Sequence, residues 1–471
     1  MSKTISKKHS LLRSLPSVDQ LLRTFSANCV EELGAERLKG FARRVIDGMR
    51  VELPGRPVER SQTLSSEALL AEAVHRLQIL CASDSRSALR RVINATGVIL
   101  HTNLGRAPLS ENAKTAITEA AGYCTLEYDV LTGSRGHRGE RVEGLLKQLT
   151  GAEDALVVNN CASAALLILT GFARDGETIV SRGELVEIGG DFRVPDVLAN
   201  SGTKMIEVGT TNRTKLEDYI RAINERTRLI MRIHPSNYRI VGFTASPSLA
   251  DLASLAHNAN LPLYEDAGSG VLDDLSDFGL RDEPIIRESV LAGADVISFS
   301  GDKLLGSAQA GIIVGKAEIV GHLRRHSLYR ALRADKLRLA ALEATLESHS
   351  RGTATVEIPT LRMLASSIDE IKERAIAIID SLRSNPKLKL DLIQGESAVG
   401  GGSGPNTHPE TMLISLEHVA LSANDIESRL RNYSPPIIGR ITNDKVLLDL
   451  RTVEPNEDAE LLRGLQSVLA N

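Results

Sequence analysis

The sequence predicts an α/β protein with a mostly parallel sheet, because short β-branched runs alternate with helical stretches from about residue 90 to residue 350. Three apolar runs, 155–158, 261–264 and 295–299, each lead directly into a polar loop. Such loops gather at the carboxyl edge of a parallel sheet, where binding sites form. The chain has 471 residues, enough for two or three domains around this layer.

The segment before the sheet is expected to be helical. Residues 17–50 are predicted to form helices, with Ser17 as an N-cap and breaks at Gly34 and Gly40. Residues 51–62 contain two prolines and a glycine and therefore predict a linker.

The last part of the chain has a different pattern. An amphipathic helix at 368–382 precedes short strands, a flexible glycine turn at 400–404 and a final helix at 457–469. The strands are expected at 388–392, 412–416 and 446–450. We therefore expect three domains: an N-terminal helical domain with its linker (1–65), a large sheet domain (66–350) and a small C-terminal α+β domain (351–471).

Composition excludes several classes of protein. Apolar residues make up 42% and charged residues 25%, as in an ordinary soluble globular protein. Aromatic residues make up only 3% without any Trp, so nucleic-acid binding would depend mainly on phosphate charge. The four Cys have no paired spacing, which argues against a disulfide framework or a zinc site and fits a reducing cytosol. The N-terminus lacks a secretory signal, and the longest apolar run, 164–169, is too short to span a bilayer.

The net charge of −4 is unevenly distributed along the chain. Residues 1–60 contain 12 Lys and Arg against 7 Asp and Glu, so this end is basic and the rest of the chain is acidic. A basic end indicates a polyanionic partner, although a solvated helical surface would give the same composition.

The first polar loop joins the run 155–158 to a helix that opens with small residues. Backbone N–H groups at a helix N-terminus bind phosphate well, and small side chains let the phosphate approach. Cys161, Ala162 and Ser163 are therefore candidate phosphate ligands, and Ser163 adds a hydroxyl. A plain helix N-cap would explain the same residues.

The other two loops carry a carboxylate and an amine. Asp266 follows a buried run and could keep a pyridinium nitrogen protonated; a turn or cap aspartate is the alternative. Lys303 lies among small residues, and apolar surroundings would favour an uncharged, nucleophilic amine; a solvated loop lysine is the alternative. Ser298 or Ser300 could bind the same phosphate.

Together the three loops supply what pyridoxal 5'-phosphate requires. These requirements are a phosphate cradle, an aspartate opposite the ring nitrogen and a lysine for a Schiff base. The groups occur in that chain order, and each follows a predicted strand. The sequence therefore predicts a pyridoxal-phosphate enzyme without a metal site.

Several longer segments resemble one family. The chain is similar to the bacterial L-seryl-tRNA(Sec) selenium transferases, or selenocysteine synthases, which are aspartate-aminotransferase-like (fold type I) pyridoxal-phosphate enzymes. The likeness covers nearly the whole chain in order, in segments 15–22, 93–110, 159–165, 182–197, 236–244, 298–306, 330–336 and 435–441. One departure is Ser307-Ala308, where the family has Gly-Pro, and we expect a less rigid loop there with no reactive group lost.

The resemblance implies a reaction and roles for individual residues. It implies conversion of L-seryl-tRNA(Sec) to L-selenocysteinyl-tRNA(Sec) with selenophosphate, through an aldimine at Lys303 and an aminoacrylate. Asp266 would keep the ring protonated, and the freed Lys303 would remove the Cα proton. Loss of hydroxide requires a general acid. Asp302 is the candidate for that acid, and a loop hydrogen bond is its other interpretation.

Selenophosphate is an anion, and arginine side chains can bind its oxygen atoms bidentately. The matching positions are Arg106, Arg330 and Arg333, of which the last two share a face if their segment is helical. Surface salt bridges are the alternative. Asn237 is a candidate for the ring hydroxyl, and the residue that stacks on the ring is expected within 187–193.

The resemblance further implies that the N-terminal domain binds the tRNA. It also implies a homodecamer built from dimers, with the active sites at the dimer interfaces. The protein is expected to be cytoplasmic, without membrane contact. In the small domain, Arg440 could anchor a carboxylate, touch the tRNA end or be structural.

Two other functions fit part of the pattern. A pyridoxal-phosphate lyase for a small phosphorylated amino substrate, such as an amino-sugar phosphate, would share the core but would not need a basic N-terminal domain. A tRNA-binding protein with an inactive former active site would not need both Asp266 and Lys303.

Overall fold

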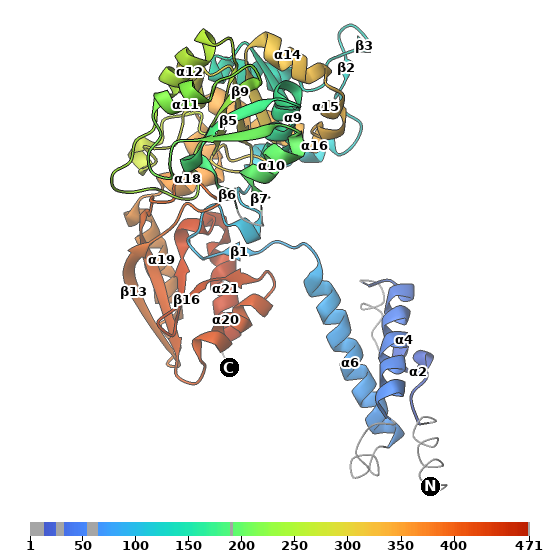
Figure 1. Ribbon diagram of the computed structural model, residues 1–471. Coiled ribbons are helices and arrows are strands. Elements are labelled where there is room, and N and C mark those ends of the chain that lie inside the picture. Colours follow the sequence, from blue (N-terminus) through green and yellow to red (C-terminus); the bar gives the residue numbers. More distant parts are fainter. Residues whose placement is uncertain (1–13, 25–32, 54–64, 189–191, 470–471) are drawn as a thin grey trace, which may run out of the picture. The chain divides into compact units, whose positions relative to one another are not determined.

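The protein is described here from a computed structural model, which covers residues 14–24, 33–53, 65–188 and 192–469. The chain divides into two compact units, Met1–Arg91 and Val92–Asn471 (Figure 1). Among the described residues, no helix combines the length and apolar character needed to cross a bilayer.

The described residues of the N-terminal unit include the helices α2 (Val18–Leu22), α4 (Ala35–Glu52) and α6 (Ser66–Ser87). Ser17 Oγ accepts a hydrogen bond from the backbone N–H of Gln20 at 3.1 Å, which confirms the predicted N-cap. Buried apolar residues from all three helices, including Leu21, Met49 and Leu77, make one small core.

Two expectations for this unit are wrong. Gly40 lies inside α4 and does not break it, because buried residues on both sides of it face the same core. The unit also extends to Arg91 rather than to residue 65, because Leu69, Ala73 and Leu77 of α6 pack into the core of this unit. Residues 54–62 of the predicted linker 51–62 lie outside the described part of the chain, and its first two residues belong to α4.

A seven-stranded sheet forms the centre of the second unit. Its strands are β4 (Asp154–Val158), β5 (Glu177–Ser181), β8 (Lys204–Val208), β9 (Thr227–Ile233), β10 (Leu263–Gly268), β11 (Val296–Ser300) and β12 (Gly311–Gly315). The spatial order is β4-β12-β11-β10-β9-β5-β8, and only β12 runs antiparallel to its neighbours. The predicted mostly parallel α/β sheet is therefore confirmed.

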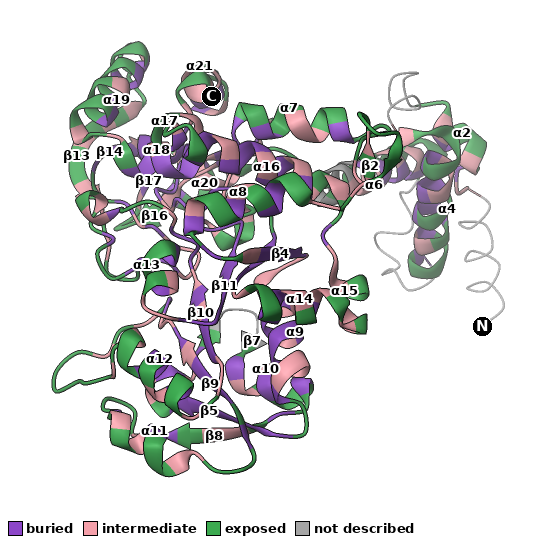
Figure 2. Cartoon of the chain, turned by 90° about the horizontal axis from the view of Figure 1, so that it is seen from above, coloured by how far each residue is buried: buried purple, intermediate pink, exposed green. Residues whose placement is uncertain are grey.

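Helices cover both faces of this sheet, so its strands are mostly buried, except the edge strand β8, which is partly exposed (Figure 2). Successive residues of β4 point to opposite faces: Leu156 and Val158 enter one core, and Ala155 and Val157 enter the other. The first core includes α9 (Cys161–Ala173), α10 (Val194–Ser201) and α14 (Ala317–Arg325). On the other face lie α8 (Glu140–Thr150), α11 (Leu216–Ala222), α12 (Leu249–Asn258), α13 (Ile286–Leu291) and α16 (Lys336–Ser350).

A smaller antiparallel sheet follows in the chain. Its order is β13-β14-β17-β16, with β13 (Leu388–Glu396), β14 (Glu410–His418), β16 (Arg440–Thr442) and β17 (Lys445–Asp449). It packs against α19 (Ile368–Leu382), α20 (Ala423–Asn432) and α21 (Asp458–Leu469). An early segment joins this region, because β1 (Ile93–Asn94) pairs in parallel with β15 (Ile437–Ile438). The helix and three strands predicted here are confirmed, although β13 and β14 are longer than expected.

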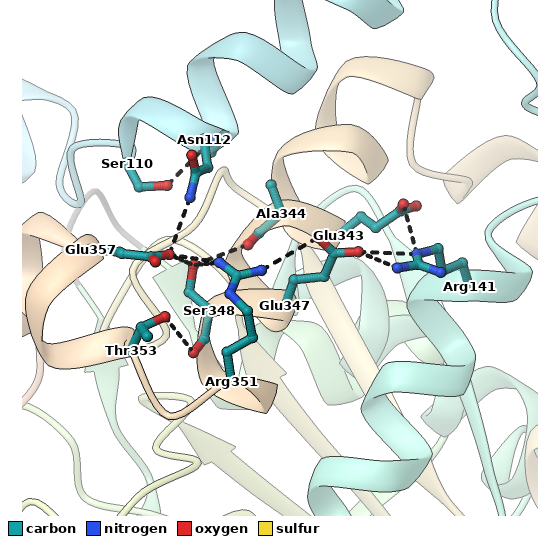
Figure 3. Close-up of polar contacts among 11 residues, drawn as sticks. Ser110, Asn112, Arg141, Glu343, Ala344, Glu347, Ser348, Arg351, Thr353 and Glu357 are labelled. Carbon is teal, nitrogen blue, oxygen red and sulfur yellow. Dashed lines mark hydrogen bonds and ion pairs between the residues drawn. The ribbon is translucent and has the colours of Figure 1, made fainter.

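A polar network joins the helices beside the large sheet (Figure 3). Glu357 of α17 (Ala354–Glu357) accepts hydrogen bonds from Ser348 Oγ of α16 at 2.6 Å and from Arg351 Nη2 at 2.8 Å. It also accepts from Asn112 Nδ2 of α7 (Glu111–Ala120) at 3.1 Å, and Arg141 of α8 pairs with α16. Exposed ion pairs contribute little stability singly, so the network mainly fixes how these helices meet.

Candidate active site

Residues from four strand ends meet in one cavity of about 240 Å³ at the carboxyl edge of the large sheet. Predicted site residues that line it are Arg106, Cys161, Ala162, Asp266, Ser300, Asp302 and Lys303. The other lining residues are Asn160, Ile233, His234, Ser236, Gly268 and Gln309. The folded chain therefore brings together groups that are up to about 200 positions apart in sequence.

The Lys303 amine is buried between two glycines. Lys303 is only 4% exposed. A Cβ atom at Gly402 would lie 3.7 Å from its Nζ, and one at Gly268 would lie 4.0 Å from it. Both glycines have positive φ, which favours glycine at these positions. The absence of side chains here keeps the space beside the amine open.

Hydrogen bonds hold the turn that carries Lys303. Gly301 N donates to Ala310 O at 2.9 Å, and Ser307 N donates to Gly301 O at 2.8 Å. Ser307 is fully buried, and its Oγ accepts from Thr345 Oγ1 of α16 at 3.1 Å. The substitution that was expected to loosen this loop therefore brings a hydroxyl that ties the loop to a core helix.

Asp266 is the last carboxylate of β10 rather than a residue after the strand. Its Oδ1 accepts from Ser298 Oγ at 3.2 Å and from Cys161 Sγ at 3.6 Å, and Ser298 also contacts Tyr264 OH at 2.8 Å. Burial raises the pKa of Asp266, and the charge of Lys303 and these hydrogen bonds oppose the shift. A cation bound opposite Asp266 would restore the ionised carboxylate.

Helix α9 points its N-terminus at the cavity. Asn160 is the N-cap, because its Oδ1 accepts from the backbone N–H of Ser163 at 2.8 Å. Cys161 and Ala162 line the cavity, but Ser163 does not. The backbone N–H groups of Cys161 and Ala162 lie in the first turn of α9, where they have no acceptor within the helix. Burial, and then the charge of Asp266, raises the pKa of the Cys161 thiol, so this cysteine is not a reactive thiolate.

Arg106 and Asp302 form an ion pair across the cavity. Arg106 Nη1 lies 2.8 Å from Asp302 Oδ2, and Asp302 is only 7% exposed. The arginine has a left-handed backbone with φ of 62°, and its N–H donates to His101 O at 3.0 Å. Asp302 therefore orients Arg106. This contact fits the second interpretation of Asp302, as a hydrogen-bonding residue, and identifies Arg106 as its partner.

Asn237 lies outside the cavity. It is exposed, and its Nδ2 donates to the backbone carbonyl of Glu187 at 2.7 Å. This contact fixes the start of the segment 187–193 that was expected to supply the stacking residue. Residues 189–191 of that segment lie outside the described part of the chain.

Arg330 and Arg333 also do not line this cavity. They were expected to share a face only if their segment was helical, and this condition is not met at Arg333, because α15 (Ser327–Leu332) ends before it. The segment nevertheless lies next to the end of β4, since Arg333 forms an antiparallel bridge with Val158. Arg333 Nη1 lies 3.8 Å from Glu127 Oε1, and Arg330 is exposed.

The glycine turn 400–404 was predicted without a role at the site, yet Gly402 packs beside Lys303. Arg440, in the same domain, donates from Nη2 to the backbone carbonyl of Glu396 at 2.9 Å. This contact supports a structural role for Arg440.

Sequence reasoning also missed His234 and Ser236. Both follow β9 and line the cavity, so the strand-then-polar-loop signal that identified Asp266 and Lys303 could have found them. His234 Nε2 lies 3.1 Å from Asp282 O, and its Nδ1 lies 3.9 Å from Glu283 Oε2. Burial lowers the pKa of His234, which favours the neutral ring.

A second cavity of about 200 Å³ opens beyond the ends of β5, β8 and β9. Its lining residues include Ser181, Glu184, Thr211, Asn212, Arg213, Thr214, Arg232, Tyr238, Arg239 and Ser246. Glu184 is only 6% exposed; its Oε1 lies 3.0 Å from Arg232 Nη1, and its Oε2 accepts from Ile233 N at 3.0 Å. Burial raises the pKa of Glu184 to about 7, against the opposing charge of Arg232.

The raised pKa predicts a pH dependence that Glu184→Gln should remove. The folded chain retains a proton on Glu184 that the unfolded chain releases near the ordinary value of 4.5, so the native protein loses stability from this group as pH rises from about 4.5 to about 7. Thermal unfolding of both proteins from pH 5 to pH 8 measures it. We expect the melting temperature of the variant to rise relative to that of the native protein as pH rises. Parallel pH profiles of the two melting temperatures would contradict the raised pKa of Glu184.

Comparison with known proteins gives consistent matches over nearly the whole chain. The family model described as "SelA: L-seryl-tRNA selenium transferase" matches residues 92–454. The L-seryl-tRNA(Sec) selenium transferase of Alkaliphilus metalliredigens is 46% identical, over 98% of this chain and 99% of the relative. The protein of that name from Geobacter metallireducens is also 46% identical, over 98% of this chain and 99% of the relative.

A solved structure supports the fold. D-glucosaminate-6-phosphate ammonia-lyase superposes with a TM-score of 0.57 at 22% identity, covering 81% of this chain and 97% of that chain. At this identity the likeness concerns the fold alone, and it confirms the predicted fold class. It does not favour a lyase activity over the activity named for the sequence relatives.

Proposed function

The chain belongs to the L-seryl-tRNA selenium transferase family, and on that premise we propose that it converts L-seryl-tRNA(Sec) to L-selenocysteinyl-tRNA(Sec) with selenophosphate and pyridoxal 5'-phosphate. The observation that carries this proposal is 46% identity to a protein of that name over 98% of the chain. The cavity adds an independent argument, because it joins a buried amine, a buried carboxyl and a helix N-terminus.

The residues of the cavity fit pyridoxal phosphate. The N–H groups of Cys161 and Ala162 would hold the phosphate, with Ser300 beside them. Burial raises the pKa of Asp266, so a cationic ring nitrogen nearby would stabilise its ionised carboxylate. Lys303 would hold the aldehyde. When bound, this coenzyme withdraws electrons from the substrate Cα and so makes loss of its proton and of a β-substituent feasible.

The chain's own groups would then move protons and hold substrates. The Lys303 amine is the candidate base for the Cα proton, because it is buried in the same cavity and can accept a proton when it is uncharged. Asp302 is the candidate acid for the departing hydroxyl, and its pairing with Arg106 makes orientation of that arginine a second role. Arg106 would bind the anionic selenium donor.

Arg330 and Arg333 are proposed to complete the selenophosphate site from another subunit. Neither lines the cavity of its own chain within the described residues. The family resemblance implies sites at the dimer interfaces of a homodecamer, where an exposed side chain such as Arg330 could reach a partner's cavity. Asn237 donates one Nδ2 hydrogen to the Glu187 carbonyl, and its second N–H would be the donor to the ring hydroxyl.

We further propose that the N-terminal unit binds the tRNA. Residues 1–60 are its basic part, and phosphate contacts would make binding dependent on salt. A cytoplasmic location belongs to the same proposal, since charged tRNA is used there.

The proposal is tested by incubating the holoenzyme with seryl-tRNA(Sec) and selenophosphate under single-turnover conditions. We expect selenocysteinyl-tRNA as product and none from free serine. Turnover of free serine or of an amino-sugar phosphate, without turnover of seryl-tRNA, would show that the substrate assignment is wrong.

Gly402→Ala tests whether the cavity beside Lys303 holds the coenzyme. The added methyl group would lie 3.7 Å from Nζ, inside the space that the coenzyme needs, so we expect about tenfold weaker coenzyme binding. Gly352→Ala is the matched control: its φ of 70° is close to the 73° of Gly402, but its surroundings are open. Both variants should lose about 1 kcal/mol of stability, because a Cβ atom is strained at positive φ. Equal coenzyme affinity in titrations of the two variants would contradict the placement.

A further inference from the structure

The second cavity adjoins the active-site cavity along one short segment. Arg232 and Pro235 line the second cavity, whereas Ile233, His234 and Ser236 line the first. Consecutive residues at the end of β9 therefore form a shared wall, and both cavities open at the carboxyl edge of the same sheet. Any substrate that extends beyond the reacting group has this neighbouring cavity within reach.

The rim of the second cavity is a bonded structure formed by two chain segments. Asn212 Nδ2 donates to Phe243 O at 2.7 Å, and Ala245 N donates to Asn212 O at 3.1 Å. Thr214 N then donates to Ala245 O at 2.9 Å. These bonds hold residues 243 and 245 at the rim. Phe243 itself does not line the cavity, and it is 90% exposed beside the lining residue Thr244. A large apolar ring held in water by a fixed loop has no partner within the described chain.

The polar groups of this cavity suit a ligand with both hydrogen-bond donors and acceptors. Arg213 is exposed at the rim, and Arg239 pairs with Asp282 at 2.7 Å. In the wall, Glu184 Oε1 is buried and, among the described residues, accepts no hydrogen bond, although it lies 3.0 Å from Arg232 Nη1. A small free anion would not need a buried carboxyl, whereas a nucleobase edge offers donors to it.

We propose that the second cavity binds the 3′-terminal nucleoside of the aminoacyl-RNA substrate, with its base toward Glu184 and against Phe243 and its phosphate at Arg213. This rests on the proposed function, which requires the terminal ester to reach Lys303. A nucleoside in the neighbouring cavity would direct its ester across the wall formed by residues 233–236. Stacking on one exposed aromatic ring contributes affinity without sequence readout.

The test uses the full-length holoenzyme and the unacylated trinucleotide CCA, whose binding is measured by equilibrium dialysis. Arg213→Ala and Phe243→Ala should each weaken binding about tenfold. Arg221→Ala, which removes an exposed arginine of α11 outside the cavity, should change it less than about twofold. A trinucleotide without its terminal base should bind weakly to the native protein and equally to all variants.

Three results would overturn the proposal. Equal CCA binding by the native protein, Arg213→Ala and Phe243→Ala would do so. An equal loss of binding in Arg221→Ala would also do so, because it would indicate unspecific charge attraction. Dissociation of the assembly in Phe243→Ala, seen by light scattering, would assign the ring to a subunit contact. Because CCA binding involves no selenium transfer, dependence on Arg213 in a protein that fails to convert seryl-tRNA would refute the proposed function and leave this site standing.

Discussion

Lys303→Ala is expected to abolish selenium transfer and covalent coenzyme binding together. The amine is buried and lies in the same cavity as Asp266 and the N-terminus of α9, and the cavity's described lining residues include no other lysine. Loss of a group that is both the covalent anchor and the Cα base should reduce single-turnover product by at least about 10⁴-fold. The measurement is formation of selenocysteinyl-tRNA in one turnover, with coenzyme content determined on the same sample.

Lys114→Ala is the matched control for this variant. Lys114 is an exposed lysine of α7 that pairs with Glu111 at 2.7 Å, and it lies outside the cavity. Its replacement should change product formation by less than about twofold, because exposed ion pairs contribute little. Retention of substantial transfer by Lys303→Ala, with an intact coenzyme spectrum, would show that another residue holds the coenzyme.

Removal of residues 1–91 is expected to raise the KM for seryl-tRNA at least about tenfold while leaving coenzyme binding unchanged. The removed part is a unit with its own core, and the remaining unit keeps both sheets and the whole cavity. Because phosphate contacts release counterions, the truncated protein should also show a weaker dependence of tRNA binding on salt. Product should recover in part at high tRNA concentration.

The position of the cut is itself a control. A protein that begins at residue 66 would retain α6 without its partners and would expose Leu69, Ala73 and Leu77. We expect this version to aggregate or to unfold at lower temperature than the version that begins at residue 92. An unchanged KM and salt dependence in the version beginning at 92 would contradict a tRNA-binding role for the N-terminal unit.

The sequence was informative where a local pattern carries the signal. Asp266 and Lys303 were identified because each stands at the end of an apolar run, and parallel strands bring such ends to one edge. The same reasoning reached Cys161 and Ala162, but it did not identify Asn160, rather than Ser163, as the N-cap of α9. Both side chains can cap a helix, and the choice depends on backbone geometry.

Contacts between distant segments could not be read from the sequence. Arg106 and Asp302 are 196 positions apart, and nothing near either residue indicates the other. Gly402 belongs to a turn of the small domain whose place beside Lys303 depends on packing of the whole unit. The apolar side of α6 could have joined either unit, so the boundary at residue 65 was a choice that only packing decides.

Reduction of the holoenzyme with borohydride, followed by mass mapping of its peptides, tests the central claim most directly. The claim is that this chain works through pyridoxal phosphate held on the buried amine between Gly268 and Gly402. We predict a single pyridoxyl-phosphate adduct per chain, on the peptide that contains Lys303. An adduct on a different lysine, or no adduct in protein that still makes selenocysteinyl-tRNA, would contradict the account.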